Sequence, residues 1–234
     1  MGLSALPAAE NGPALRRIRW QQACRIVPTR YPSVSLFDRV ADAADFDALY
    51  ALEAMSNERV REEIGHIERV PRDQRVFGPG SGPIMAAFTH VNLLGSRFSD
   101  GRHGVFYAAR ERATAVAETR HHHGNFLAAT QQDPMHLPMR LYHVAIDARL
   151  HDLRPVGAVP EAVHDPDDYT AARTLGHALH AAGSAGVAYR SVRRPGGQCA
   201  GLFRPRGASR CLHAAVLLYA WDGMAFTDVF EKTE

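Results

Sequence analysis

Lysine is almost absent from this sequence: Lys232 is the single one, so arginine supplies 26 of the 27 Lys and Arg side chains. Acidic residues number 25, which leaves a net charge of +2 and argues against the strongly basic surface typical of nucleic-acid binding. The arginine bias fits a GC-rich genome. Some arginines remain candidates for phosphate binding, because the planar guanidinium offers two parallel donors to an oxyanion.

Cysteine is also scarce. Cys24, Cys199 and Cys211 are odd in number and far apart, which argues against a disulfide framework and fits a reducing cytosol. The first residues lack the basic start and apolar run of a secretory signal, and Leu6 stands where a myristoylation signal needs Ser or Thr. No apolar run approaches the ~20 residues that span a bilayer. We therefore expect a cytoplasmic protein without a membrane anchor.

The rest of the composition is that of a globular protein, with 46% hydrophobic and 22% charged residues in a chain of 234. A chain of this length can form one domain that buries roughly 70% of its unfolded surface. We expect a flexible extension at 1–17, rich in Ala, Pro and Gly, and a single domain at 18–234. The sequence leaves the oligomeric state open.

The hydrophobic pattern predicts helices mainly in the first half and strands mainly at the end. Asn57 is expected to cap a short helix that runs to Ile64, and Ser81-Gly82-Pro83 to start another, since proline suits the first helical position. Asp222-Gly223 is expected to form a two-residue hairpin turn. This arrangement favours an α+β fold with a central mixed or antiparallel sheet and flanking helices. The other expected helices are 45–55, 111–123 and 169–182, and the expected strands are 19–27, 103–109, 137–147, 187–192, 198–203, 214–221 and 225–229.

Three motifs suggest ligands but carry weak signals. The glycine-rich run at 78–82 could cradle a phosphate at a helix N-terminus, yet it lacks the Lys of a P-loop and the spacing of a dinucleotide fingerprint. The three histidines at 121–123 point in three directions on a helix, so they cannot share one metal ion. Cys199, Cys211 and His213 lack the paired spacing of a zinc site. We expect no metal.

The segment from Gly95 to Glu118 has more chemical content. Arg97 lies in a turn-rich loop, Tyr107 lies near the end of the following strand, and Glu118 lies in the next helix among small residues. A carboxylate in such surroundings is either partly buried with a partner or faces a cleft. The alternative is an exposed Glu118, a core Tyr107 and an arginine without a role, which composition alone would favour.

This set resembles the RES-domain family, which is named for arginine, glutamate and serine. The family's middle motif is a Gly-Arg-aromatic loop, a strand ending in Tyr and an Ala-rich helix bearing Glu; here these are 95–98, 105–107 and 114–118. Tyr107 and Glu118 are eleven positions apart (118 − 107), the usual step.

The resemblance extends over residues 23–203. Upstream, Arg25 matches the arginine of the family's first strand, with Arg30 as a second candidate. Downstream, the family has a helix with Gly and then a Gly-x-x-Tyr-x-Ser strand, here 175–177 and 186–191. Ser191 is the candidate for the serine role, and Thr170 is the alternative because some members carry a hydroxyl at the start of that helix. The long stretch at 38–90 departs from compact members and is expected to be a helical insertion.

The resemblance implies a fold like that of ADP-ribosyltransferases and cleavage of the nicotinamide–ribose bond of NAD⁺, without a metal. Arg97 and Arg25, with Arg30 and Thr170 beside them, would contact the NAD⁺. Glu118 would stabilise the positive charge that develops on the ribose. Tyr107 would stack on nicotinamide, and Ser191 would orient the amide or the ribose.

The acceptor stays open. Water would give a glycohydrolase, inorganic phosphate a phosphorylase, and a protein side chain a mono-ADP-ribosyltransferase. A non-catalytic partner-binding module is a further alternative. Because family members are often toxins encoded beside an Xre-type antitoxin, the resemblance also implies an antitoxin that blocks the active site.

Overall fold

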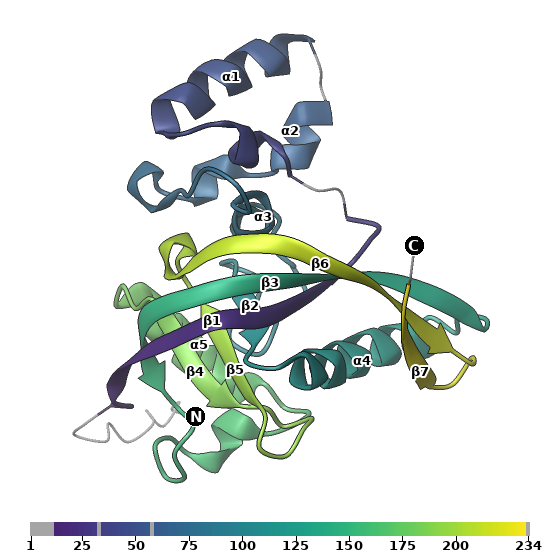
Figure 1. Cartoon of the computed structure of the whole chain (residues 1–234). Helices are drawn as coiled ribbons and strands as arrows, with labels where there is room; N and C mark the ends of the chain where they lie inside the picture. The colour runs from purple at the N-terminus through teal and green to yellow at the C-terminus, as the bar shows by residue number, and fades with distance from the viewer. Residues whose placement is uncertain (1–11, 32–33, 57–58, 233–234) are drawn as a thin grey trace, which may run out of the picture.

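The structure is a computed structural model, and it describes residues 12–31, 34–56 and 59–232. Across these residues seven strands form one mixed sheet in the order β1-β2-β5-β4-β3-β6-β7, with helices packed against it (Figure 1). All neighbouring strands are antiparallel except β3 and β4. The expected α+β fold with a central mixed sheet is confirmed. The strands are β1 (Leu15–Pro28), β2 (Phe106–Ala109), β3 (Met135–Asp152), β4 (Gly186–Arg190), β5 (Gln198–Leu202), β6 (Ala208–Trp221) and β7 (Phe226–Glu231).

Strand β1 joins two parts of the sheet. It pairs with β3 along its whole length but with β2 only at Cys24↔Ala109. The side chain of Arg25 links the two strands where backbone hydrogen bonds between them are missing: its Nη1 donates to the Tyr107 carbonyl of β2 at 3.0 Å. The strands therefore diverge next to the two predicted site residues on them.

A bulge in β1 decides which side chains face which side of the sheet. The register with β3 shifts between Trp20 and Ala23. Since alternate residues of a strand point to opposite faces, the inserted residue changes the phase of the alternation. Ala23 thus joins Trp20 in one apolar layer, while Cys24 and Ile26 belong to the other.

Those two layers lie on opposite faces of the sheet. The first is covered by helical segments from 36–89, whose rings of Phe37 and Phe46 stack at 4.8 Å. The second is covered by α4 (Arg112–Ala129), η4 (Glu161–His164) and α5 (Thr170–Ala181).

The segment expected as a helical insertion is helical throughout its regular elements, and α3 rests on β6 (Figure 1). Asn57, the expected cap, lies outside the described residues. That residues 38–90 are an insertion relative to compact members of the family stays a prediction. Its elements are η1 (Leu36–Arg39), α1 (Ala43–Ser56), α2 (Arg59–Ile64), η2 (Ile67–Arg69), η3 (Arg72–Gln74) and α3 (Gly82–Thr89), and η5 (Pro205–Gly207) follows later in the chain.

The glycine-rich run before α3 packs against protein rather than framing an open anion site. The Gly82 amide donates to Asp38 Oδ1 at 2.7 Å, and the Ser81 hydroxyl donates to the same oxygen at 3.2 Å. A carboxylate therefore already occupies the positive end of the helix. A Cβ on Gly82 would lie 1.8 Å from the Val34 carbonyl oxygen, which explains the glycine.

Several sequence expectations need correction, because α4, β3 and β6 extend beyond the expected ranges 111–123, 137–147 and 214–221, and three further differences have local causes. The extension expected at 1–17 is too long, because β1 starts at Leu15 and its first residues pair with β3; residues 1–11 lie outside the described part. Strand β2 is shorter than expected and starts at Phe106, because residues 99–103 form a hydrogen-bonded loop. The turn between β6 and β7 spans 222–225 rather than two residues, since Asp222 Oδ1 accepts from the amides of Met224 and Ala225.

The three cysteines are buried and unpaired. Within the described ranges, no helix combines the length and apolar character that crossing a membrane requires.

Candidate active site

A cleft of about 550 Å³ opens between the diverging strands β1 and β2, helix α4 and the loop that precedes β2. Among the predicted site residues, Arg97, Tyr107 and Glu118 line it, and Arg25 and Arg30 line it from β1 and the residues after it. The chain thus brings residues from separate segments to one concavity. The remaining lining residues are Cys24, Ile26, Val27, Tyr31, Asn92, Leu94, Gly95, Ser96, Ala108, Ala109, Ala115, Thr119, His122, His123, Phe126, Tyr189 and Cys199.

Glu118 and Ser191 form a short hydrogen bond across the wall of this cleft. The Ser191 hydroxyl donates to Glu118 Oε1 at 2.6 Å. Ser191 is 8% exposed, and its oxygen also accepts from the amides of Arg193 and Arg194 in the turn after β4. The serine therefore fixes one carboxylate oxygen of Glu118 and is itself held in place by backbone donors.

Arg97 is the most buried charged side chain of the cleft, at 5% exposed. Its Nη1 donates to the Asp165 carbonyl at 2.7 Å, and its guanidinium carbon lies 4.3 Å from the centre of the Tyr169 ring. Its Nη2 is buried and has no hydrogen-bond partner among the described residues. A buried guanidinium that is fixed in place and keeps an unused donor is suited to an anionic ligand.

Tyr107 orients the loop that carries Arg97. Its hydroxyl contacts the Ser96 hydroxyl at 2.8 Å and accepts from the Phe98 amide at 3.0 Å. Burial raises the pKa of this phenol to about 12, so it stays neutral at physiological pH. The expected stacking on a substrate ring would use the ring of Tyr107, while its hydroxyl holds the loop.

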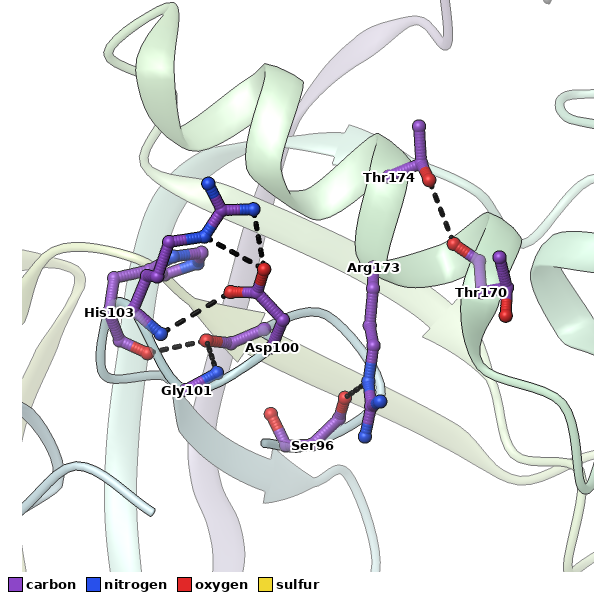
Figure 2. Close-up of polar contacts among 9 residues, drawn as sticks. Ser96, Asp100, Gly101, His103, Thr170, Arg173 and Thr174 are labelled. Atoms are coloured by element: carbon purple, nitrogen blue, oxygen red, sulfur yellow. Dashed lines mark hydrogen bonds and ion pairs between the residues drawn. The ribbon is translucent and has the colours of Figure 1, made fainter. Parts of the chain in front are cut away.

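Helix α5 supports the same loop from outside. Arg173 donates to the Ser96 carbonyl at 3.0 Å, as Figure 2 shows. A Cβ on Gly176 would lie 2.2 Å from the Phe98 carbonyl oxygen, so only glycine allows the helix to approach this closely. Close packing of α5 against the loop thus explains why the helix motif has glycine at position 176.

The other candidates lie at different depths. Arg25 is half-buried, lies 4.5 Å from the centre of the Phe106 ring, and has a buried Nε without a partner in the described structure. Burial lowers the pKa of its guanidinium. Arg30 is exposed at the mouth of the cleft beside Tyr31. Thr170 is exposed at the start of α5 (Figure 2). It does not line the cleft, so the structure does not bring this alternative to the other residues.

Sequence reasoning missed Tyr169 and His122. Tyr169 stacks on Arg97, and its ring lies 6.4 Å from that of His122. Desolvation in the cleft, together with the guanidinium groups of Arg193 and Arg97, lowers the pKa of His122. No periodicity signals a tyrosine one residue before a helix, and three consecutive histidines do not indicate which of them faces a cleft. In the described residues, no group of His, Cys, Asp or Glu is arranged to hold a metal ion.

Comparison with known families decides the affiliation. The family described as the RES domain matches residues 69–222, which is more than half of the chain. The chain belongs to the RES-domain family. The matched region contains Arg97, Tyr107, Glu118, Thr170 and Ser191.

The RES match starts within the helical segment, so strand β1 with Arg25 and the following Arg30 precede it. Similarity to one relative covers more of the chain: the uncharacterized protein y4oC of Sinorhizobium fredii (strain NBRC 101917 / NGR234) is 27% identical over 212 residues, which are 85% of this chain and 82% of y4oC. In its fold the chain is also similar to the crystal structure of the M. tuberculosis MbcT–MbcA toxin–antitoxin complex, with a TM-score of 0.45 and 12% identity over 93% of this chain and 87% of that one.

Proposed function

We propose that this RES-domain protein cleaves the nicotinamide–ribose bond of NAD⁺, with water or inorganic phosphate as the acceptor. The observation that carries the proposal is Glu118, held by Ser191, in the same cleft as a buried Arg97 with an unused donor. These groups match the two charges of the substrate: a diphosphate, and a ribose that becomes positive as the bond breaks.

Each side chain has a specific task in this proposal. Arg97 Nη2 would donate to the diphosphate without reorganising, because Asp165 and Tyr169 already fix the guanidinium. The carboxylate of Glu118 would stabilise the developing cation, and the oxygen that does not accept from Ser191 would hold a ribose hydroxyl. The Tyr107 ring would support the nicotinamide from the β2 side of the cleft.

The test is to incubate the purified chain with NAD⁺ and separate the products chromatographically. We expect free nicotinamide together with ADP-ribose in water, or with a phosphorylated ADP-ribose when inorganic phosphate is the acceptor. A third arm with cell extract and labelled NAD⁺ detects the alternative, a mono-ADP-ribosyltransferase, as label on a protein. Failure to release nicotinamide in all three arms would leave the non-catalytic partner-binding module as the better account.

Arg97→Ala is expected to raise the KM for NAD⁺ by about tenfold to a hundredfold, with a smaller fall in kcat. The lost contact is a charged hydrogen bond to a group that does not react, so ground state and transition state weaken alike. Steady-state kinetics give the split between KM and kcat. Arg149→Ala is the matched control, since Arg149 is exposed on β3 and does not line the cleft. An unchanged KM in Arg97→Ala would remove Arg97 from diphosphate binding.

We also propose an antitoxin of the Xre type that blocks the cleft, because unrestrained cleavage of NAD⁺ would harm the host and family members are often paired in this way. A peptide with a terminal carboxylate could meet the arginines at 25, 30 and 97 in place of the diphosphate. Co-purification with the product of the neighbouring gene should give a complex that does not release nicotinamide. A complex that forms but turns over NAD⁺ normally would contradict the blocking mode.

A further inference from the structure

A second cavity, of about 280 Å³, lies outside the cleft and shares none of its described lining residues. It is enclosed by the helical segment at 69–74, the end of the loop at 102–104, the last turn of α5 and the residues after β5. This second cavity therefore lies where the helical segment meets the sheet.

Its lining is basic. Three arginines and two histidines face it, and the described lining contains no acidic residue. Arg102 is neutralised by Asp100, to which it donates through two nitrogens. Arg204 donates only to the His180 carbonyl at 3.3 Å, and the Arg69 side chain forms no hydrogen bond or ion pair with another described residue. Two guanidinium groups thus remain available to an anion.

A half-buried imidazole adds an unsatisfied polar atom. The rings of His103 and His180 stack with their centres 4.0 Å apart and an interplanar angle of 16°. His103 Nε2 is buried without a hydrogen-bond partner among the described residues. Burial lowers the pKa of His103 to about 4, helped by the charges of His180 and His177 and opposed by Asp100. An anion beside this ring would favour its protonated form and would accept a hydrogen bond from Nε2.

We propose that this second cavity is a binding site for a phosphate-type dianion. The guanidinium groups of Arg69 and Arg204 supply the charge and the paired donors that phosphate oxygens prefer. His103 supplies a further donor when it takes up a proton on binding. The shared chemistry is a phosphate dianion, whether it is inorganic phosphate or the end of a phosphomonoester.

The second cavity lies at the end of the loop that carries Arg97, because His103 lines the cavity. The loop starts at Gly95 and ends at His103, whose carbonyl accepts a hydrogen bond from the Ser99 hydroxyl at 2.7 Å. An anion held by Arg204 and His103 would fix the far end of this loop to the sheet and, through Arg69, to the helical segment.

Isothermal titration of the full chain with inorganic phosphate and, separately, with 5′-AMP tests the proposal and distinguishes the two sources. We expect saturable binding that weakens about tenfold in Arg204→Gln and in Arg69→Gln. Arg149→Gln removes an exposed arginine outside both cavities and should bind like the wild type. Arg97→Ala should also retain the binding, which separates this site from the cleft and from NAD⁺ cleavage.

A second readout uses sulfate, which stays a dianion between pH 5.5 and 7.5. Because binding raises the pKa of His103, sulfate affinity should increase as the pH falls from 7.5 to 5.5. His103→Gln should abolish that increase. Loss of phosphate binding in Arg97→Ala with normal binding in Arg204→Gln would place the anion in the cleft and overturn the proposal, as would the absence of saturable binding. An unchanged pH response in His103→Gln would overturn the assignment of the proton to this ring.

Discussion

Glu118→Gln is expected to reduce kcat for NAD⁺ cleavage by at least about a hundredfold while the protein keeps its fold. Gln retains an oxygen that can accept the hydrogen bond from Ser191, which measures 2.6 Å in the wild type. It lacks the negative charge that stabilises the developing cation of the ribose, and it cannot regain that charge at any pH. Single-turnover release of nicotinamide measures the effect on the chemical step.

The matched control is Glu68→Gln, because Glu68 is exposed in the helical segment and does not line the cleft. It removes the same charge and should leave kcat unchanged. Thermal unfolding of both variants separates loss of function from loss of structure. Should Glu118→Gln turn over NAD⁺ normally, the carboxylate would be a structural partner of Ser191 and the proposed mechanism would be wrong.

Gly176→Ala is expected to destabilise the protein by about 3 kcal/mol, although alanine is the better helix former. The added Cβ would lie 2.2 Å from the Phe98 carbonyl oxygen and 2.9 Å from its carbon, so backbone has to move. Phe98 follows Arg97, and the displacement should therefore also raise the KM for NAD⁺. Chemical denaturation gives the free energy of unfolding.

Helix α4 offers the control for this substitution. A Cβ on Gly124 would meet only ring atoms of Phe226 and Trp221, the nearest at 3.7 Å, which is ordinary contact. Gly124→Ala should accordingly stabilise the protein by about 0.5–1 kcal/mol through helix propensity. If the two alanines have the same effect, the close approach of α5 to the loop does not limit stability.

Local sequence patterns predicted much of the fold. The apolar alternation at 187–203 and the turn residues at 195–197 are sufficient to predict the β4–β5 hairpin, because both signals are short-range. The start of β1 could not be predicted, since Leu15 is 43% exposed and is held by backbone pairing with β3 rather than by its own burial. Pairing across such a distance leaves no local signal.

The candidate site shows the same division. The resemblance selected Arg97, Tyr107, Glu118 and Ser191, and the structure places the first three in one cleft with Ser191 bonded to Glu118. The Tyr107 hydroxyl bonds to Ser96 and Phe98, which lie eleven and nine positions earlier in the sequence. These hydrogen bonds form only because the loop folds back against strand β2. That detail follows from tertiary structure alone, and so does the ring that covers Arg97.

The pairing of β1 has a consequence for the order in which the protein forms during synthesis. Leu15 pairs with His151 and Pro28 with Met139, so apart from the single Cys24↔Ala109 pair with β2, strand β1 has no partner strand until β3 has been made. Contacts so distant along the chain form slowly, because a long loop must close before they contribute. Strand β5, which pairs with β2, is made later still. A nascent chain therefore cannot complete the cleft before Cys199 of β5, which lines it, has been made.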